Sequence, residues 1–306
     1  MLTGSLIGNP PFLTLFHNAQ TNTFSEFAGS GEIGFVSNAS VVRVPSFHIT
    51  GNGSIAGNVS NSDKKCVLFY PGCFNPLTRA HLRSLEESKD YLTHLGWNVL
   101  GGIISPTHDN YKFFKPSLIS SVHRVKMIEL SIRNYNFARC STWESNQQNY
   151  SSFGDALKEH RNQIHAVVKN PISNHQNFPH LPQSLTMVQN ADLDDPNKFR
   201  IFVVLGGDLL ESVCLNHWTN NEIEYIVKNF SILVRARHRS NPRKCIKYHP
   251  ILQKYRKNIH VVTDNIPFEL SSTDIRNAVK SGNSIKFCVD DAVIQYIEEN
   301  NLYRNK

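Results

Sequence analysis

The sequence lacks any apolar run that approaches the roughly 18 residues of a membrane span, so we expect a soluble chain with no membrane span. Its six cysteines include no CxxC pair, which argues against a zinc site and favours a reducing compartment. Residues 1–63 contain only one arginine, too little basic charge for a mitochondrial transit peptide, and the N-terminus lacks the basic start of a secretory signal. We therefore expect an intracellular protein of the cytoplasm or nucleus.

The composition is that of a globular protein with a basic surface. The 306 residues are 40% hydrophobic, enough for a sizeable core. The formal net charge is +7 and the pI is about 9.1, so the surface attracts anions. Charge alone does not decide whether these anions are nucleotides, nucleic acid or acidic lipids.

The composition and the pattern of apolar residues change near residue 64. Residues 1–63 are rich in Gly, Ser, Asn and Thr without a helical or strand period, which predicts a disordered extension. Residues 64–306 alternate short apolar runs with amphipathic segments, the pattern of strands joined by crossover helices. Within this domain, residues 170–198 carry four prolines and many amides, which predicts a long, mobile insertion.

The fold class follows from the apolar runs. Their β-branched residues do not alternate with polar ones, which indicates strands covered on both faces. We therefore predict an α/β domain with a Rossmann-like, doubly wound parallel sheet. The candidate strands are 66–70, 99–104, 137–142, 201–205, 230–235 and 259–262.

The first candidate site is "GCFNPLTRAH", residues 72–81, directly after the first candidate strand. Ligands of open parallel sheets bind outside the carboxyl ends of the strands. Gly72 lets the backbone approach a phosphate, Pro76 fixes the turn, and the following helix offers N–H groups to an anion. His81 lies on the first turns of that helix, where a hydrogen-bonded core histidine is the alternative.

Two further motifs stand at predicted helix starts. Asp208 in "LGGDLLES" follows a strand, and a helix cap is its structural alternative. In "LSSTDIR", residues 270–276, the Ser/Thr run can cap a helix whose N–H groups face an anion. Arg276, one turn in, can bring a forked guanidinium to the same anion. A Ser/Thr run before a helix is usually only a cap, so each motif is weak alone.

Together the motifs are specific. The chain resembles the nucleotidyltransferases that carry GxFxPxHxGH near one end and SSTxxR near the other. Within that superfamily it is similar to eukaryotic nicotinamide/nicotinic acid mononucleotide adenylyltransferases over about residues 66–303. The matching blocks are "GCFNPLTRAHLR", "GGIISPTHDNYK", "HRVKMIEL", "TWESNQQ", "LGGDLLES", "NIHVV", "LSSTDIRNAVKSGNSI" and "YIEENNLY".

The resemblance implies a role for each matching residue. Catalysis would involve His81, Lys115 and Arg276. ATP and its phosphates would contact Gly72, Cys73, Phe74, Thr78, His81, Lys112, Lys115, Thr273, Asp274, Ile275 and Arg276. The mononucleotide and the NAD product would contact Gly72, Cys73, Tyr150, Gly206, Asp208, His217 and Trp218.

The sequence departs from the family pattern at several places. Thr78 stands where the family motif has its first histidine. "KFFKPS" carries an apparent two-residue insertion between Lys112 and Lys115, and placing it at the two phenylalanines favours Lys115 as the ATP contact. Tyr150 stands where many members have a second stacking tryptophan. Phe153 replaces a threonine that often touches the pyridine nucleotide, so a side-chain hydrogen bond is lost there.

The implied function is the joining of ATP with nicotinamide mononucleotide (NMN) or nicotinic acid mononucleotide (NaMN), giving NAD or its deamido form and pyrophosphate, with Mg²⁺. The implied partners are these small molecules and not nucleic acid, and a homo-oligomer remains possible. Two rivals stay open: another adenylyl- or cytidylyltransferase of the same fold, and a non-catalytic, chaperone-like protein.

Overall fold

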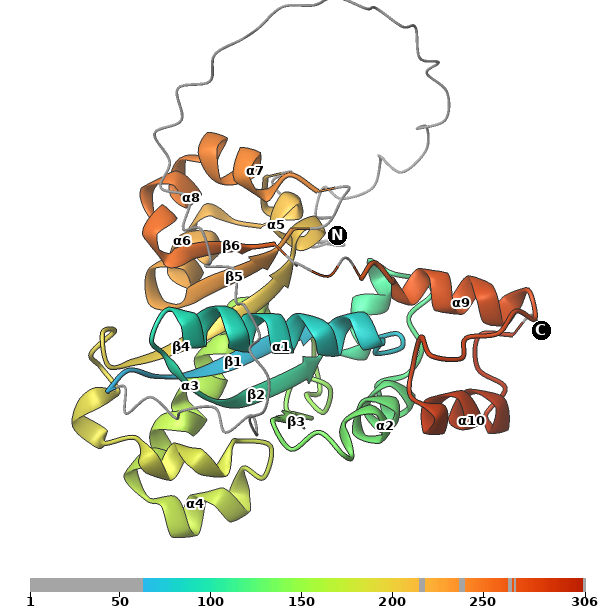
Figure 1. The fold of residues 1–306 in the computed structure, drawn as a ribbon, viewed down its shortest axis with the longest axis horizontal. Coiled ribbons are helices and arrows are strands. Elements are labelled where there is room, and N and C mark those ends of the chain that lie inside the picture. The colour runs from blue at the N-terminus through green and yellow to red at the C-terminus, as the bar shows by residue number, and fades with distance from the viewer. Residues whose placement is uncertain (1–62, 215–217, 237–239, 264–265, 267, 305–306) are drawn as a thin grey trace, which may run out of the picture. The chain divides into compact units, whose positions relative to one another are not determined.

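A computed structural model describes residues 63–214, 218–236, 240–263, 266 and 268–304 (Figure 1). The predicted extension, residues 1–63, therefore lies outside the described part apart from Asp63. No helix in the described ranges is long and apolar enough to cross a membrane.

The core of the domain is a six-stranded sheet in which every neighbouring pair is parallel. The strand order is β3-β2-β1-β4-β5-β6, the doubly wound order in which the chain reverses direction of winding between β1 and β4. Both the fold class and the six predicted strands are confirmed. The strands are β1 (Lys65–Gly72), β2 (Asn98–Pro106), β3 (Ala138–Cys140), β4 (Phe199–Gly206), β5 (Ser231–Arg235) and β6 (Ile259–Val262).

Helices follow the strands in the alternation that the sequence predicts. The α-helices are α1 (Arg79–His94), α2 (Ser121–Ile132), α3 (Phe153–Lys169), α4 (Pro171–Asn177), α5 (Gly207–Cys214), α6 (Asn220–Asn229), α7 (Pro242–Tyr248), α8 (Pro250–Lys254), α9 (Ser272–Lys280) and α10 (Asp291–Glu299). Short 3₁₀ turns are η1 (Asp109–Phe113), η2 (Gln183–Met187), η3 (Asn190–Asp192) and η4 (Arg256–Asn258).

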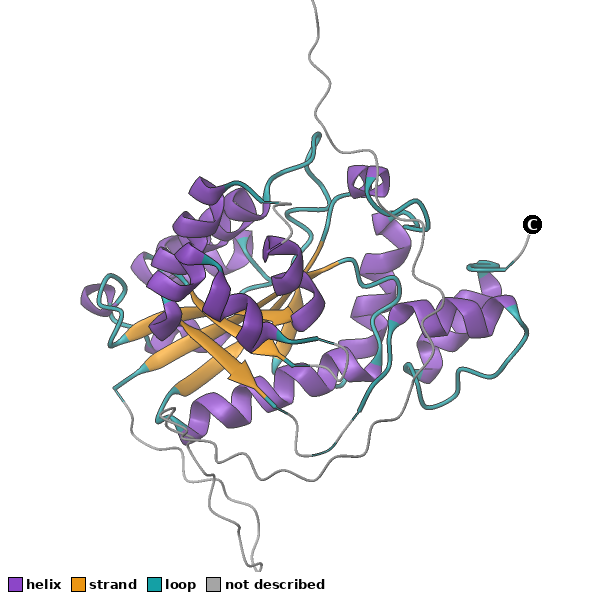
Figure 2. Ribbon diagram, turned by 90° about the horizontal axis from the view of Figure 1, so that it is seen from above, coloured by secondary structure: helices purple, strands orange, loops and turns teal. Residues whose placement is uncertain are grey.

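The sheet is buried on both faces, as Figure 2 shows. Successive side chains of a strand point to opposite faces. Val67 and Phe69 of β1 accordingly pack in a cluster with α3, α5 and α6, whereas Leu68 and Tyr70 pack in a second cluster with α1 and α2. This two-sided burial explains why the strands read as continuous apolar runs.

A third apolar cluster fixes the C-terminal helices. Ile275 of α9 and Val293 and Ile297 of α10 pack against Met127 of α2, and all four side chains are at most 1% exposed. Helix α9 therefore has its own packed support, which holds its N-terminus in a constant position.

The segment 170–198, predicted to be a mobile insertion, folds onto the domain in several places. Leu181, Leu185 and Val188 are buried in the cluster that covers one face of the sheet. The Ser184 hydroxyl donates a 2.6 Å hydrogen bond to the Leu100 carbonyl of β2. These contacts hold the segment against β2 and α3, and its mobility stays a prediction.

The cysteines form no metal-binding group in the described residues. Cys66, Cys73, Cys140 and Cys288 are free thiols. Cys245 is disulfide-bonded, which departs from the reduced set that a reducing compartment predicts.

Two adjacent glycines of β2 test the packing of residues 170–198. A Cβ on Gly101 would lie 2.7 Å from Cγ of Pro182, whereas a Cβ on Gly102 would meet only ordinary contacts at 3.5 Å. Both alanine substitutions lower the entropy of the unfolded chain equally, so their difference isolates the clash. We expect Gly101→Ala to lower the free energy of unfolding by about 1–3 kcal/mol more than Gly102→Ala, measured by urea unfolding. Equal stabilities would show that Pro182 does not press on β2.

Candidate active site

The site is built around the loop of residues 72–78, which leaves the carboxyl end of β1. A Cβ on Gly72 would lie 3.0 Å from the ring of Phe74, a tight contact that glycine avoids. Phe74 itself has a φ of 45°, a left-handed conformation that is costly for an aromatic residue. Its buried ring packs edge-on against Tyr70 and His81, each with centroids 5.4 Å apart, and this packing stabilises the strained turn.

Helix α1 orients His81 through its own cap. The backbone N–H of Thr78 donates to Nδ1 of His81 at 3.0 Å, and the Thr78 hydroxyl lies 2.7 Å from the same nitrogen. Because a backbone N–H can only donate, Nδ1 must be an acceptor, so the neutral imidazole carries its hydrogen on Nε2. His81 is half-buried, and its ring is thus fixed as an Nε2–H donor at a helix N-terminus. Thr78, which replaces the first motif histidine, performs this orienting role.

Helix α9 begins against the same loop. Arg276 donates from Nη1 to the Asn75 carbonyl at 3.0 Å and from Nη2 to the Thr273 hydroxyl at 3.1 Å. The Ser272 hydroxyl donates to the Pro76 carbonyl at 2.8 Å. The sequence-predicted residues of the first and third motifs, which are about 200 positions apart, therefore lie side by side.

The remaining residues of the third motif are divided between capping and packing. The Asp274 carboxylate accepts from the backbone N–H and hydroxyl of Ser271, which completes a capping box. Ile275 is 1% exposed in the C-terminal cluster. Any contact of Ile275 with phosphate would therefore run through its backbone N–H, while Thr273 is exposed.

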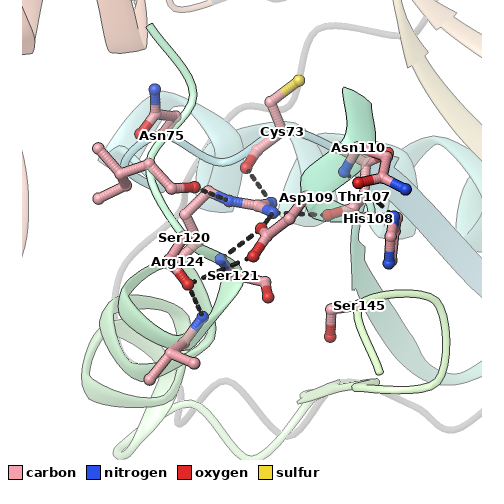
Figure 3. Close-up of polar contacts among 12 residues, drawn as sticks. Cys73, Asn75, Thr107, His108, Asp109, Asn110, Ser120, Ser121, Arg124 and Ser145 are labelled. Carbon is pink, nitrogen blue, oxygen red and sulfur yellow. Dashed lines mark hydrogen bonds and ion pairs between the residues drawn. The ribbon is translucent and has the colours of Figure 1, made fainter. Parts of the chain in front are cut away.

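A buried arginine joins the two loops that surround the site, and the sequence reading did not single it out (Figure 3). Arg124 of α2 has no exposed surface, and its guanidinium donates to the Cys73 carbonyl at 3.0 Å and to the Thr107 carbonyl at 2.7 Å. Its Nε donates to the Ile119 carbonyl at 3.0 Å, and Nη2 pairs with Asp109 at 2.9 Å. The signal was present as the arginine of "HRVKMIEL", yet spacing cannot reveal that a helical arginine is buried.

Asp109 balances the buried guanidinium. Burial disfavours its charge, but hydrogen bonds from Arg124 and from the Ser121 backbone N–H prevail and lower the pKa of Asp109. The carboxylate therefore stays ionised at neutral pH. It also accepts from the Ser121 N–H at the start of α2, which ties the helix to the loop after β2.

A second polar link connects the loop after β2 with residues 144–150. His108 accepts from the Asn110 N–H at Nδ1, so its Nε2 donates to the Gln147 carbonyl at 2.9 Å. Glu144 is 6% exposed and accepts from the Ser105 hydroxyl at 3.2 Å. Burial raises the pKa of Glu144, against the opposing hydrogen bonds from Thr107 and Ser105. These contacts position the segment that carries Tyr150.

The structure distinguishes the two lysines of the insertion. Lys115 is half-buried and close enough to Cys73 to be the chief charge opposing the burial that raises the pKa of that thiol. Lys112 is exposed in η1. The inserted Phe113 and Phe114 are 86% and 66% exposed, so they extend into solvent, whereas the charge of Lys115 acts on Cys73 of the loop of residues 72–78.

The predicted aromatic residues each have a supporting ring. Tyr150 is 44% exposed and stacks on Tyr111 with centroids 6.2 Å apart and an interplanar angle of 28°. Trp218 packs edge-on against Phe153 at 5.1 Å, and its indole N–H donates to the Ser212 hydroxyl at 3.3 Å. His217 lies outside the described residues.

The end of β4 completes the arrangement. The pairing of β1 with β4 places Phe69 opposite Val203, so Gly72 and Gly206 end neighbouring strands three residues further on. Among the described residues nothing lies within 4 Å of a Cβ built on Gly206, so this backbone borders open space. A Cβ on Gly207 would clash with the Ser240 side chain, which explains the second glycine. Asp208 is exposed in the first turn of α5.

Arg235, the last residue of β5, has a structural role. It is 8% exposed and pairs with Glu87 of α1 at 3.0 Å. It also donates to the Ser84 hydroxyl at 3.1 Å and to the Phe268 carbonyl at 3.3 Å. Arg235 therefore anchors α1 to the end of β5.

Comparison with known proteins agrees with this geometry. The family described as cytidylyltransferase-like matches residues 69–278, which begin in β1 and end in α9. The chain belongs to this family.

Curated relatives narrow the family further. The chain is 34% identical over 264 residues to nicotinamide/nicotinic acid mononucleotide adenylyltransferase 1 of Bos taurus, covering 81% of this chain and 92% of the relative. It is 37% identical to the nicotinamide-nucleotide adenylyltransferase of Drosophila melanogaster, over 77% of this chain and 60% of the relative. It is 34% identical to the enzyme of Oryza sativa subsp. japonica, over 78% and 86% respectively. The chain is thus a member of the mononucleotide adenylyltransferase branch.

Solved structures were matched at lower identity. A nicotinic acid mononucleotide adenylyltransferase of Plasmodium falciparum, complexed with APC, matches with a TM-score of 0.49 at 17% identity. It covers 78% of this chain and 97% of its own.

The geometry of this site suits the binding of an anion and presents no activated nucleophile among the residues described above. Two helix N-termini, those of α1 and α9, meet the loop of residues 72–78 with the Nε2–H of His81 and the guanidinium of Arg276. Lys115 adds a third side chain that can carry positive charge or donate. N–H groups and cations at helix N-termini stabilise phosphate charge.

Arg124 gives a direct test of this construction. Arg124→Lys keeps the charge, but its three N–H donors cannot serve all four acceptors of Arg124, which lie on Ile119, Cys73, Thr107 and Asp109. Because buried acceptors would lose their partners, we expect unfolding free energy to fall by about 2–4 kcal/mol and kcat to fall with it. The control is Arg133→Lys, at the exposed end of the same helix. Equal effects of both substitutions, measured by urea unfolding and steady-state kinetics, would refute the role given to Arg124.

Proposed function

We propose that the protein transfers the adenylyl group of ATP to the phosphate of NMN or NaMN, releasing pyrophosphate. One observation supports this most directly: the Thr78 backbone N–H fixes His81 as an Nε2 donor, beside an Arg276 that is hydrogen-bonded to the same loop. The relatives of the chain carry this activity in their names.

The reaction explains why the site offers charge rather than a nucleophile. The mononucleotide phosphate is largely a dianion at neutral pH because its second pKa is about 6. One of its oxygens attacks the α-phosphorus of ATP and forms the new P–O–P bond. The bond from that phosphorus to the bridging oxygen breaks, and the electron pair leaves with pyrophosphate. No proton needs to be removed from the attacking oxygen, so an activated serine or cysteine has no task.

The charged residues have separate tasks in this scheme. The Nε2–H of His81 donates to the transferring phosphate, and its fixed orientation removes the cost of reorganisation. Arg276 and Lys115 stabilise the negative charge that accumulates on the departing pyrophosphate. Holding both substrates at one loop converts a bimolecular reaction into an effectively unimolecular one.

The residues of the site fit a divalent ion held mainly by substrate. Within the described residues no group of three or more His, Cys, Asp or Glu side chains could bind a metal. The Asp109 carboxylate is engaged by Arg124, and Glu144 is buried with Ser105. Mg²⁺ commonly binds substrate phosphates with few protein ligands, and when bound it neutralises phosphate charge. We propose Mg²⁺, held through the ATP phosphates.

Aromatic contacts suit both pyridine mononucleotides. The faces of Tyr150 and Trp218 do not distinguish an amide from a carboxylate, and Phe153 supports Trp218 without offering a hydroxyl. A strong preference would require a fixed hydrogen-bonding partner for one group. We propose that the enzyme uses NMN and NaMN with kcat/KM values within about tenfold, or about 1.4 kcal/mol.

A coupled assay that detects NAD formed from ATP and NMN tests the proposal, and NaMN in place of NMN tests the second substrate. Product would exclude the non-catalytic, chaperone-like alternative. Turnover of CTP, or of a non-pyridine acceptor in preference to NMN, would favour the other transferases of this fold. The intracellular location and the homo-oligomer remain predictions.

The first kinetic prediction concerns His81. We expect His81→Ala to lower kcat on the order of 10²–10³-fold, because loss of one preorganised donor to transition-state charge typically costs that much. The KM for NMN should change little. His94→Ala, at the exposed C-terminal end of the same helix, is the matched control and should keep kcat unchanged. Near-normal turnover in His81→Ala would make His81 a packing residue.

A second prediction separates the two lysines. Lys115→Ala should lower kcat/KM for ATP by about tenfold or more, because it removes one charge-assisted hydrogen bond. Lys112→Ala removes the same charge from the same loop at an exposed position and should have a smaller effect. The measurement is steady-state kinetics with ATP varied. A larger effect of Lys112→Ala than of Lys115→Ala would show that the two-residue insertion lies after Phe114.

A further inference from the structure

A cavity of about 230 Å³ lies at the amino ends of β4 and β5, at the opposite edge of the sheet from the candidate active site. Its walls come from α3, the loop before β4, the end of α6 and η4. The strand β4 runs from Phe199 at this cavity to Gly206 at the active site, a span of about 23 Å. The cavity is therefore separate from the nucleotide site.

The lining of this cavity is strongly cationic. Arg161, Arg200 and Lys228 line it, and Asp194 is the sole carboxylate among the lining residues. Asp194 is 83% exposed and lies 3.6 Å from Arg161, a long and solvated ion pair that contributes little. Within the described residues Lys228 forms no ion pair. The cavity thus holds an excess of positive charge.

Arg200 is held in place but not saturated. Its Nη1 donates to the Ser231 hydroxyl at 2.8 Å, and its Nε donates to the Pro196 carbonyl. In the described part of the chain Nη2 makes no hydrogen bond. Two neutral hydrogen-bond partners and the ring of Trp97, whose centroid lies 5.9 Å from Cζ of Arg200, thus orient a guanidinium with no carboxylate beside it. The Nη2 group of this planar guanidinium is the donor that suits a phosphate.

His165 also lines this cavity, and its pKa depends on the charges there. Burial lowers the pKa of His165, and Arg161 and Lys169 lower it further, while Asp194 opposes them. The ring of His165 also lines the cavity, so an anion bound there would favour its charged form. Its titration is therefore a local probe of cavity occupancy.

The volume and the walls limit what fits. Phe199 and Phe230 are buried beneath the charged rim, and Asn229 and Asn258 add amide groups. The space exceeds the roughly 150 Å³ of an engineered protein cavity that takes up benzene. A phosphate group with a small attached organic group therefore has both the charged rim and the apolar floor it needs.

We propose that this cavity is a second anion-binding site, which takes the phosphate group of a small organic phosphate between Arg161, Arg200 and Lys228. The site goes beyond the proposed transferase activity and does not depend on it. Two elements reach from it to the mononucleotide contacts: β4 ends at Gly206, and α3 begins at Phe153, which packs on Trp218.

Nuclear magnetic resonance of the full chain tests the proposal with inorganic phosphate as the probe. The His165 ring resonance is assigned by its loss in His165→Asn and titrated with pH at constant ionic strength. We expect millimolar phosphate to raise the pKa of His165 saturably, whereas chloride should not. Phosphate bound at the active site leaves this resonance unmoved, so failure here says nothing against the transferase.

Variants that remove one charge distinguish phosphate binding in this cavity from a general electrostatic effect of phosphate on the protein. Lys228→Gln should weaken phosphate binding by about tenfold, as expected for loss of one charge-assisted contact. Lys257→Gln removes an equal charge from exposed η4 without lining the cavity and should leave binding unchanged. Asp194→Asn removes the negative charge from the lining and should strengthen phosphate binding. This second variant keeps the proposal testable even if Lys228→Gln destabilises the fold. Absence of a phosphate effect, or equal losses in the two lysine variants, would overturn the proposal.

Discussion

The reversal of winding between β1 and β4 is the constraint on which the rest of this structure depends. Helix α1 leaves β1 toward one face of the sheet and α5 leaves β4 toward the other, so no crossover covers the ends of these neighbouring strands. The pairing of β1 with β4 ends at Phe69 and Val203, and Gly72 and Gly206 are the last residues of these two neighbouring strands. The helix N-termini that follow them place positive dipole ends at one place, which suits a reaction in which phosphate attacks phosphate.

The loop at this opening is built from carbonyl groups that need donors. Arg124 donates a hydrogen bond to the Cys73 carbonyl, Arg276 donates to the Asn75 carbonyl, and Ser272 donates to the Pro76 carbonyl. A buried unpaired carbonyl costs free energy, so these donors stabilise a loop that contains Phe74 at a positive φ. The two guanidinium groups that satisfy the backbone also bring positive potential to a site for phosphates. Stability of the loop and catalysis thus draw on the same side chains.

Positive charge is concentrated at both edges of the sheet. At the carboxyl edge Lys115 and Arg276 face the catalytic loop, and at the amino edge Arg161, Arg200 and Lys228 face a separate cavity. Each edge thus offers an anion more cationic than anionic side chains.

The sequence by itself determined the sheet and its six strands, because apolar runs and glycine-bearing helix starts follow local rules of backbone geometry. The roles predicted for His81 and Arg276 came from the resemblance to the nucleotidyltransferases and not from those local rules. Tertiary structure alone decided that residues 170–198 pack on β2 and that Arg235 anchors α1. It also revealed Arg124, whose three carbonyl partners come from separate segments of the chain. The physical reason is that charge and burial depend on neighbours distant in sequence, which spacing along one chain does not encode.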